Sequence, residues 1–192
     1  MRYFVTNDVC KSIHKGLDQM RYLREASLGA DVYALFDHSV LQAPVEYVFL
    51  LHVGDCEDGV RPLFEMQCLT VGTDSGASID NRTIVKSILD RNTGACILVH
   101  NHPPDASISP STQDIDTTTI LLNLLGKIEV NLVDHVIVHS DGYLSIYDYA
   151  MWQAARKYGY VLLPTPQVPS PQDHNARNQE TASAQYLTME VL

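Results

Sequence analysis

The segment that decides the fold is residues 100–114, which read HNHPPDASISPSTQD. It follows residues 95–99, an uninterrupted apolar run that predicts a central strand covered on both faces. It leads into residues 114–125, whose apolar positions fit one side of a helix that ends at Gly126. A strand that passes through a loop into a helix is typical of an α/β sheet, which presents its reactive groups at the carboxyl ends of the strands.

Two histidines, His100 and His102, stand two residues apart at the start of this segment. On an extended backbone such side chains point to the same side, so both imidazoles can reach one metal ion. Asp114 opens the following helix and can turn its carboxylate back as a third ligand. Two neutral nitrogens and one carboxylate suit Zn²⁺ and leave a fourth position open for water, whose pKa zinc lowers to about 7. The sequence therefore predicts a catalytic zinc site at His100, His102 and Asp114.

The flanking segments predict helices packed on a mixed sheet. Residues 46–53 and 63–71 are short apolar runs on either side of an acidic turn, and they predict an antiparallel pair of strands. Residues 83–90 predict a helix, and residues 133–138 and 143–146 predict two further strands. Near the N-terminus, apolar residues at spacings of three and four predict an amphipathic helix over residues 7–26.

Composition narrows the class of protein. The 192 residues carry 13 Lys and Arg against 23 Asp and Glu, a net charge of −10, and 45% are hydrophobic. This acidity weighs against direct binding of nucleic acid, because phosphates are neutralised by clustered Lys and Arg. The apolar runs are far shorter than the roughly 20 residues that cross a bilayer, and no secretory signal begins the chain. We therefore expect a cytoplasmic protein without a membrane span, whose four cysteines are reduced.

The length predicts one domain with an appendage. We expect residues 1–30 to supply an N-terminal helix that packs on the domain, and residues 31–159 to form the domain itself. Four prolines lie within residues 164–171, and a polar stretch follows them. We expect residues 160–192 to be a disordered tail, because few apolar side chains remain there to be buried.

The pattern His100-Asn101-His102-Pro103, followed by Pro110-Ser111 and Asp114, resembles the H-x-H, Ser, Asp signature of the JAMM metalloproteases, also called MPN-plus or JAB, in the version carried by bacterial RadC-like proteins. The resemblance covers roughly residues 33–149. It implies an α/β fold of the JAB/MPN type, with a curved mixed sheet flanked by helices, similar in architecture to cytidine deaminases. The chain departs from the pattern at one point, since eight residues separate His102 from Ser111 where the family generally has seven. Four further segments occur in the order seen in RadC-like domains: residues 72–73, 98–99, 134–138 and 143–145.

The resemblance also implies an activity, the zinc-dependent hydrolysis of a peptide or isopeptide bond in a peptide or protein substrate, ubiquitin-like proteins included. In that family a glutamate beside the first strand is the general base. Glu46 matches the position best, Glu65 on the return strand is the alternative, and Glu57 in an exposed turn is disfavoured. Ser111 would donate a hydrogen bond to the oxyanion of the reaction. Serine three residues before Asp114 can also cap the helix, and the two roles can coexist.

Two other functions compete with the hydrolase. RadC-like proteins were named for DNA repair or the handling of mobile DNA, but the acidic charge and the absence of a paired helix-hairpin-helix pattern disfavour direct DNA binding. The third hypothesis is an inactive scaffold that binds a partner through the same groove. We expect structural roles for the remaining chemistry-bearing residues, namely His52, Cys96, the pair Asp134-His135, and His139.

Overall fold

The computed structural model of the chain describes residues 22–72 and 79–150, in which six strands form one sheet in the order β1-β3-β2-β4-β5-β6. The strands are β1 (Tyr22–Arg24), β2 (Tyr47–Val53), β3 (Val60–Val71), β4 (Ala95–Asn101), β5 (Asn131–His139) and β6 (Gly142–Ser145). The helices are the 3-10 helix η1 (Glu25–Ser27), α2 (Leu28–Tyr33), α3 (His38–Leu41), α4 (Asn81–Arg91) and α5 (Thr112–Gly126). The predicted strands and helices between residues 46 and 146 are confirmed, with ends shifted by up to three residues.

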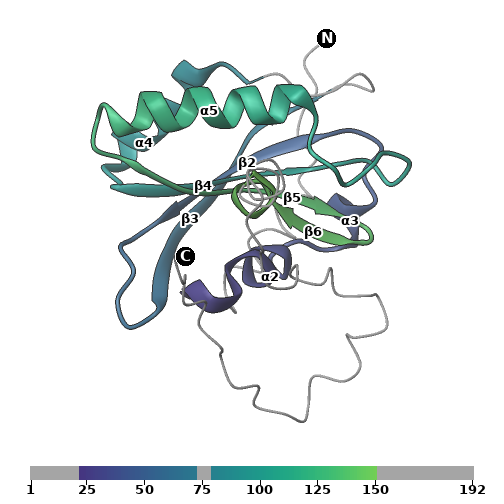
Figure 1. Ribbon diagram of the computed structural model, residues 1–192, viewed down its shortest axis with the longest axis horizontal. Coiled ribbons are helices and arrows are strands. Elements are labelled where there is room, and N and C mark those ends of the chain that lie inside the picture. Colours follow the sequence, from purple (N-terminus) through teal and green to yellow (C-terminus); the bar gives the residue numbers. More distant parts are fainter. Residues whose placement is uncertain (1–21, 73–78, 151–192) are drawn as a thin grey trace, which may run out of the picture.

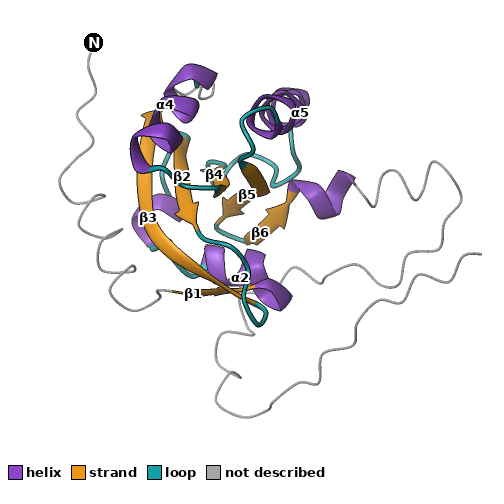
Figure 2. Ribbon diagram, turned by 90° about the vertical axis from the view of Figure 1, so that its left-hand side faces the viewer, coloured by secondary structure: helices purple, strands orange, loops and turns teal. Residues whose placement is uncertain are grey.

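The sheet is mixed and curled. β2 pairs antiparallel with β3 and with β4, whereas β4 pairs parallel with β5. Register shifts interrupt the β2 and β3 ladder twice, and the β4 and β5 ladder once, between Cys96 and Ile97. Bulges of this kind bend a strand and increase its twist, and Figure 2 shows the long strand β3 curving from α4 toward α2. The predicted α/β fold with a curved mixed sheet is confirmed.

Helices cover both faces of the sheet, with α4 and α5 on one face and α2 on the other (Figure 1). All seven residues of β4 are buried, as the unbroken apolar run predicts. Cys96 and Leu98 pack with side chains of α4 and α5, and Ile97 and Val99 pack with those of α2. Because successive side chains of a strand alternate between faces, His100 belongs to the face that α5 covers.

The prediction of an N-terminal helix over residues 7–26 is wrong at residues 22–24. Tyr22–Arg24 forms strand β1, which pairs antiparallel with β3. Leu23 is fully buried between two exposed neighbours, a period of two rather than of 3.6. Asp31 accepts hydrogen bonds from the backbone N–H (2.8 Å) and Nε (2.9 Å) of Arg24, which holds this segment against α2. Sheet pairing and this ion pair therefore outweigh the local helical spacing.

The other predictions for the two ends of the chain concern residues 7–21 and 160–192, which lie outside the described residues. The domain boundaries at residues 31 and 159 stay predictions, although β1 joins the sheet before the first of them. No helix within the described ranges is long and apolar enough to cross a membrane. Cys56, Cys68 and Cys96 are free thiols, and burial raises the pKa of Cys96 to about 12, so this thiol is inert.

A carboxyl group is buried in β5. Asp134 is 5% exposed, and its Oδ1 accepts hydrogen bonds from the backbone N–H of His135 (2.7 Å) and from Oγ of Ser145 (3.0 Å). Burial raises the pKa of Asp134 to about 7, and these two hydrogen bonds only partly oppose the rise. The structural role predicted for Asp134 agrees with these contacts, which hold the backbone of β5 against β6.

Replacing this carboxyl group should change how stability depends on pH. An unfolded aspartate ionises near pH 3.9, so between about pH 4 and 7 the folded chain retains a proton that the unfolded chain releases, and stability falls as the pH rises. We expect the free energy of unfolding of Asp134→Asn, relative to the parent, to rise by about 2–4 kcal/mol between pH 4 and pH 8, since each pKa unit corresponds to about 1.4 kcal/mol. Urea unfolding at both pH values measures this difference, and a constant difference would contradict the prediction.

Candidate metal centre

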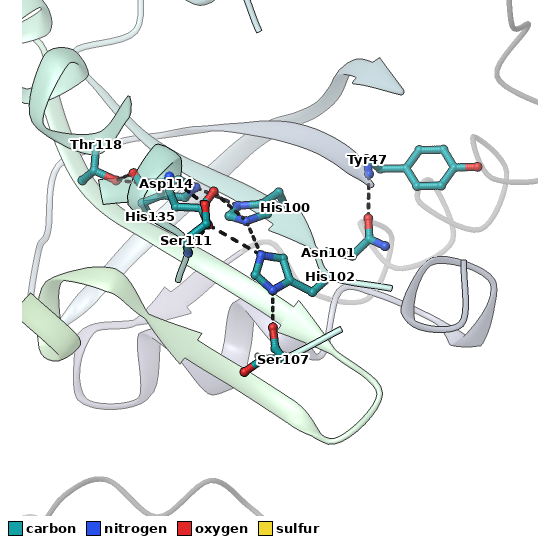
Figure 3. A network of polar contacts seen from close by, with 9 residues as sticks. All are labelled: Tyr47, His100, Asn101, His102, Ser107, Ser111, Asp114, Thr118 and His135. Atoms are coloured by element: carbon teal, nitrogen blue, oxygen red, sulfur yellow. Dashed lines mark hydrogen bonds and ion pairs between the residues drawn. The ribbon is translucent and has the colours of Figure 1, made fainter. Parts of the chain in front are cut away.

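Three candidate ligands converge where β4 meets α5. His100 lies near the end of β4, His102 follows the strand, and Asp114 lies in the first turn of α5 (Figure 3). The Nε2 atoms of the two histidines are 3.0 Å apart. Asp114 Oδ1 lies 3.2 Å from Nε2 of His100, and Oδ2 lies 3.7 Å from Nε2 of His102. The structure thus brings together the three residues predicted to bind the metal.

The geometry of this cluster fits a zinc ion. In tetrahedral coordination, nitrogen and oxygen atoms that share one zinc at about 2.0–2.1 Å are themselves roughly 3.3–3.4 Å apart. The measured separations of 3.0, 3.2 and 3.7 Å each lie within a few tenths of an ångström of this value. The donor set of two imidazoles and a carboxylate is also the type that zinc prefers. His100 and His102 are almost completely buried, which keeps competing water away from them.

The electrostatics of the cluster favour a positive charge beside Asp114 and His102, whereas they keep His100 neutral. Burial lowers the pKa of His100 to about 4. Burial also opposes the protonation of His102, but the hydrogen bonds to Asp114 and to the Ser107 carbonyl, with the charges of Asp114 and Glu46, outweigh it and raise the pKa of His102. Burial would raise the pKa of Asp114 too, yet its bond to His102 and its other partners hold it well below the usual range. A protonated His102 and a bound cation would each satisfy the lone pairs that Asp114 and His100 direct into the cluster.

The start of α5 sets the orientation of Asp114. Ser111 is the N-cap, and a capping box joins it to Asp114. Oγ of Ser111 accepts from the backbone N–H of Asp114 (3.1 Å), and Asp114 Oδ2 accepts from the backbone N–H and the hydroxyl of Ser111, both at 2.7 Å. Oδ2 is thereby held at the cap, which leaves Oδ1 facing His100. The capping role predicted for Ser111 is confirmed, and its oxyanion role stays a prediction.

Asp114 lies beside both histidines although the loop before it has one residue more than the pattern that the sequence resembles. A turn from Pro103 to Ala106 shortens the path, with a backbone hydrogen bond of 2.9 Å. The Ser107 carbonyl then lies 2.5 Å from Nδ1 of His102. Because a carbonyl only accepts, Nδ1 of His102 must donate, and its Nε2 is the atom directed at Asp114. The longer loop therefore supports His102.

Glu46 faces the same site. It directly precedes β2, is half-buried, and lines a cavity of about 230 Å³ together with His100 and Asp114. Asn101 points to the opposite face of the sheet from the two histidines. Its side chain accepts from the backbone N–H of Tyr47 (2.7 Å) and donates to the carbonyl of Val45 (3.1 Å). The residue between the two histidines thus anchors the backbone on both sides of Glu46.

The two other candidate glutamates lie elsewhere. Glu65 forms an ion pair with Arg91, with contacts of 2.6 and 2.7 Å, and it pairs across the sheet with His52. His52 is four residues along β2 from Val48, the residue that pairs with His100, so Glu65 lies on the order of 13 Å from the site. Glu57 is exposed in the turn before β3 and does not line the cavity. Among the three, the structure places only Glu46 beside the candidate ligands.

The structure brings one histidine to the site that the sequence had assigned a purely structural role. His135 Nε2 lies 2.9 Å from Nδ1 of His100, and His135 Nδ1 lies 2.7 Å from the hydroxyl of Thr118 in α5. No local signal in the sequence could have found it, because the register of β5 against β4 pairs His135 with Leu98 on the face that α5 covers. The two other histidines expected to be structural lie away from the cavity. His52 is bonded to Ser87 and Thr93, and Nδ1 of His139 accepts a hydrogen bond from the backbone N–H of Asp141.

Comparison with known proteins finds a match to one family model. The family model of the RadC-like JAB domain matches residues 27–151, which include every candidate site residue. The UPF0758 proteins of Chlorobium phaeovibrioides and of Pelodictyon phaeoclathratiforme are each 30% identical over 134 residues, a region covering 69% of this chain and 58% of the relative. A UPF0758 protein of Pseudomonas fluorescens is 37% identical over 92 residues, covering 48% of this chain and 41% of the relative. The chain therefore spans only about half of the length of these relatives, and their name states no activity.

The helix cap generates a prediction about stability. Ser111→Ala removes the hydroxyl that accepts from the backbone N–H of Asp114, so we expect the free energy of unfolding to fall by about 1 kcal/mol. Thr119→Ala is the matched control, because its exposed hydroxyl donates to the Ile115 carbonyl within the helix. We expect this control to change stability by less than about 0.5 kcal/mol. Urea unfolding compares the two variants, and equal effects would show that the cap contributes nothing specific.

Proposed function

The chain belongs to the RadC-like JAB domain family, and from this membership and the site geometry we propose that it is a zinc-dependent hydrolase of a peptide or isopeptide bond. The observation that carries the proposal is the convergence of two imidazole nitrogens and a carboxylate oxygen, in which His100 and Asp114 line the same cavity as Glu46. Family membership gives a JAB-like domain. The donor set of the site supports metal-assisted hydrolysis as the reaction that we propose for it.

His100, His102 and Asp114 would hold the metal in this proposal. Zinc, when bound, polarises the scissile carbonyl and lowers the pKa of water to about 7. The three ligands are supported by separate contacts: His100 by His135, His102 by the Ser107 carbonyl and Asp114 by the cap at Ser111. Such supports keep ligands oriented and raise the affinity of a site for its metal.

Glu46 is the general base in the proposed reaction. It accepts a proton from the attacking water and delivers it to the nitrogen of the leaving amine, so that the carboxylate is regenerated in each turnover. Its position supports this role, because it lines the cavity with His100 and Asp114 and the charge of its carboxylate acts on His102. Ser111 would stabilise the oxyanion, for which its hydroxyl hydrogen must turn from Asp114 toward the cavity.

The lining of the cavity supports an uncharged reacting group such as a peptide bond. Apolar side chains of Val48, Ile79 and Ile120 share the wall with the polar side chains of Asn81 and Gln113. No Lys or Arg is among the described residues that line it. A phosphodiester would need cationic or strongly donating partners there, and the chain as a whole carries a net charge of −10. The hydrolase therefore accounts for this site better than nucleic-acid chemistry does.

The metal ligands can be tested by metal content. We expect the purified parent to bind about one zinc ion per chain, measured by elemental analysis after dialysis, and the double variant His100→Ala, His102→Ala to bind none, because a single carboxylate does not retain zinc. His38→Ala is the matched control, since His38 is an exposed histidine at the start of α3. Stoichiometric zinc in the double variant would remove this site from consideration.

The general base can be tested separately from the metal. We expect Glu46→Gln to retain zinc but to lose at least about 100-fold in hydrolysis, because the amide cannot accept the proton of the water. Glu65→Gln is the matched control and should retain both, since Glu65 lies outside the cavity. The assay exposes the zinc-loaded protein to a proteome-derived peptide library and to ubiquitin-like fusion proteins, with mass spectrometry as the readout.

The outcomes of this assay and of a DNA-binding experiment separate the three functional hypotheses. Undiminished hydrolysis by Glu46→Gln would overturn the assignment of the base. A zinc-loaded parent that cleaves none of the substrates would count against the enzyme and in favour of the binding scaffold. Tight, salt-sensitive retardation of DNA in a mobility-shift experiment would favour the DNA-handling function instead.

A further inference from the structure

We infer that His135 and Thr118 are positioning residues, which fix the ring proton of His100 on Nδ1 and so present the Nε2 lone pair of His100 to a metal ion. The inference rests on the proposed metal site and adds two residues to it, neither of which was among the residues predicted to act in catalysis. Figure 3 shows the chain of contacts on which it depends, running from Thr118 through His135 to His100.

Thr118 is the only possible donor in its contact with the backbone of Asp114. Oγ1 of Thr118 lies 2.6 Å from the backbone carbonyl oxygen of Asp114. A carbonyl can only accept, so the single hydroxyl hydrogen of Thr118 is donated there. The same Oγ1 lies 2.7 Å from Nδ1 of His135. Because Thr118 has no second hydrogen to give, this contact is a hydrogen bond only if Nδ1 of His135 carries the proton and donates it.

The proton position of His135 in turn fixes that of His100. A neutral imidazole has one N–H, so Nε2 of His135 is an acceptor. It lies 2.9 Å from Nδ1 of His100, which must therefore donate. That leaves Nε2 of His100 without a proton, and this is the atom that lies 3.0 Å from His102 Nε2 and 3.2 Å from Asp114 Oδ1. The lone pair that a metal requires thus points into the ligand cluster.

The reverse arrangement of protons is unfavourable on the same distances. If Thr118 donated to His135, then Nε2 of His135 would donate to His100 and push the proton of His100 onto Nε2. Two oxygen atoms, Oγ1 of Thr118 and the Asp114 carbonyl, would then stand 2.6 Å apart with no hydrogen between them. A buried oxygen pair of this kind is repulsive. The reversed network would also place a proton where a cation has to bind.

The hydrogen bonds form one chain that joins three elements. It runs from His100 in β4 through His135 in β5 to Thr118 in α5, and it ends at the backbone carbonyl of Asp114. The candidate ligands His100 and Asp114 are therefore linked by hydrogen bonds that do not require a metal. Thr118 and His135 are 4% and 2% exposed, so water does not compete for these bonds.

The experiment compares metal affinity in pairs of variants that differ in one hydrogen-bonding group. Thr118→Val removes the hydroxyl at nearly constant volume, and Thr118→Ser keeps it. His135→Leu removes both ring nitrogens, and His135→Gln keeps an acceptor within reach of His100. Removing partners that orient metal ligands lowers affinity by about 10- to 100-fold. We expect that loss for Thr118→Val and His135→Leu, and less than a 3-fold change for Thr118→Ser and His135→Gln, with Zn²⁺ affinity measured against a chelator of known strength.

A second measurement reads the tautomers directly. Two-bond ¹⁵N–¹H correlation spectra of histidine-labelled protein at pH 8 distinguish a proton on Nδ1 from one on Nε2. We expect Nδ1–H for both His100 and His135 in the parent, and a mixture at both residues in Thr118→Val, with the exposed His38 unchanged as the control. Circular dichroism verifies that each variant is folded, and the conservative Thr118 pair keeps the test informative if His135→Leu does not fold.

The results distinguish failure of the inference from failure of the proposed function. A parent that binds no zinc would overturn the metal site, and the inference with it. A parent that binds zinc while Thr118→Val and His135→Leu bind it equally well would overturn the inference alone. An Nε2–H signal for His100 in the parent would also overturn it, whatever the affinities are.

Discussion

The site depends on the position of β4 between β2 and β5. Strands flank β4 on both edges and side chains cover it on both faces, so its register is fixed by burial as well as by hydrogen bonds. A slip of one residue would turn His100 and His102 to the opposite face of the sheet. It would also move Leu98 out of the apolar cluster that it forms with side chains of α4 and α5. The same alternation sends Asn101 to the far side, where it holds the backbone beside Glu46. One buried strand therefore places two candidate ligands and, indirectly, the candidate base.

The bulge between β4 and β5 decides which side chain supports His100. Cys96 pairs with Leu132 but Ile97 pairs with Asp134, so β5 contains one extra residue at this point. If the register of Cys96 with Leu132 continued without a bulge, Asp134 would stand opposite Leu98 and face α5, and His135 would face α2. The observed register instead buries the Asp134 carboxyl near Ser145 and offers an imidazole to His100. A neutral partner can relay a hydrogen bond there, whereas a carboxylate would add a further negative charge to the cluster.

The parts of this structure that could be predicted from the sequence are those with local causes. His100, His102 and Asp114 follow from a strand, a loop and a capped helix that are contiguous in the chain, and the geometry brings them together as predicted. The parts that could not be predicted depend on distant pairing. Helical spacing near Leu23 gave no sign that β3 would draw residues 22–24 into the sheet. The choice between Glu46 and Glu65 depends on Arg91, which lies 26 residues from Glu65 and engages it in an ion pair. The role of His135 follows from a bulge that no local pattern marks.

The cap of α5 shows how Ser111 can hold a ligand and still be free to act on a substrate. The capping box itself consists of two bonds, from the Ser111 N–H to Asp114 Oδ2 and from the Asp114 N–H to Ser111 Oγ. Neither bond uses the hydroxyl hydrogen of Ser111, which is donated separately to Oδ2. A cation bound at Asp114 would withdraw electron density from that carboxylate and weaken this third bond, while the other two continue to cap the helix. The hydroxyl hydrogen is therefore the one part of the cap that can turn toward a developing oxyanion without uncapping α5 or releasing Asp114. On these contacts the two roles of Ser111 are compatible, because they use different atoms of the same side chain.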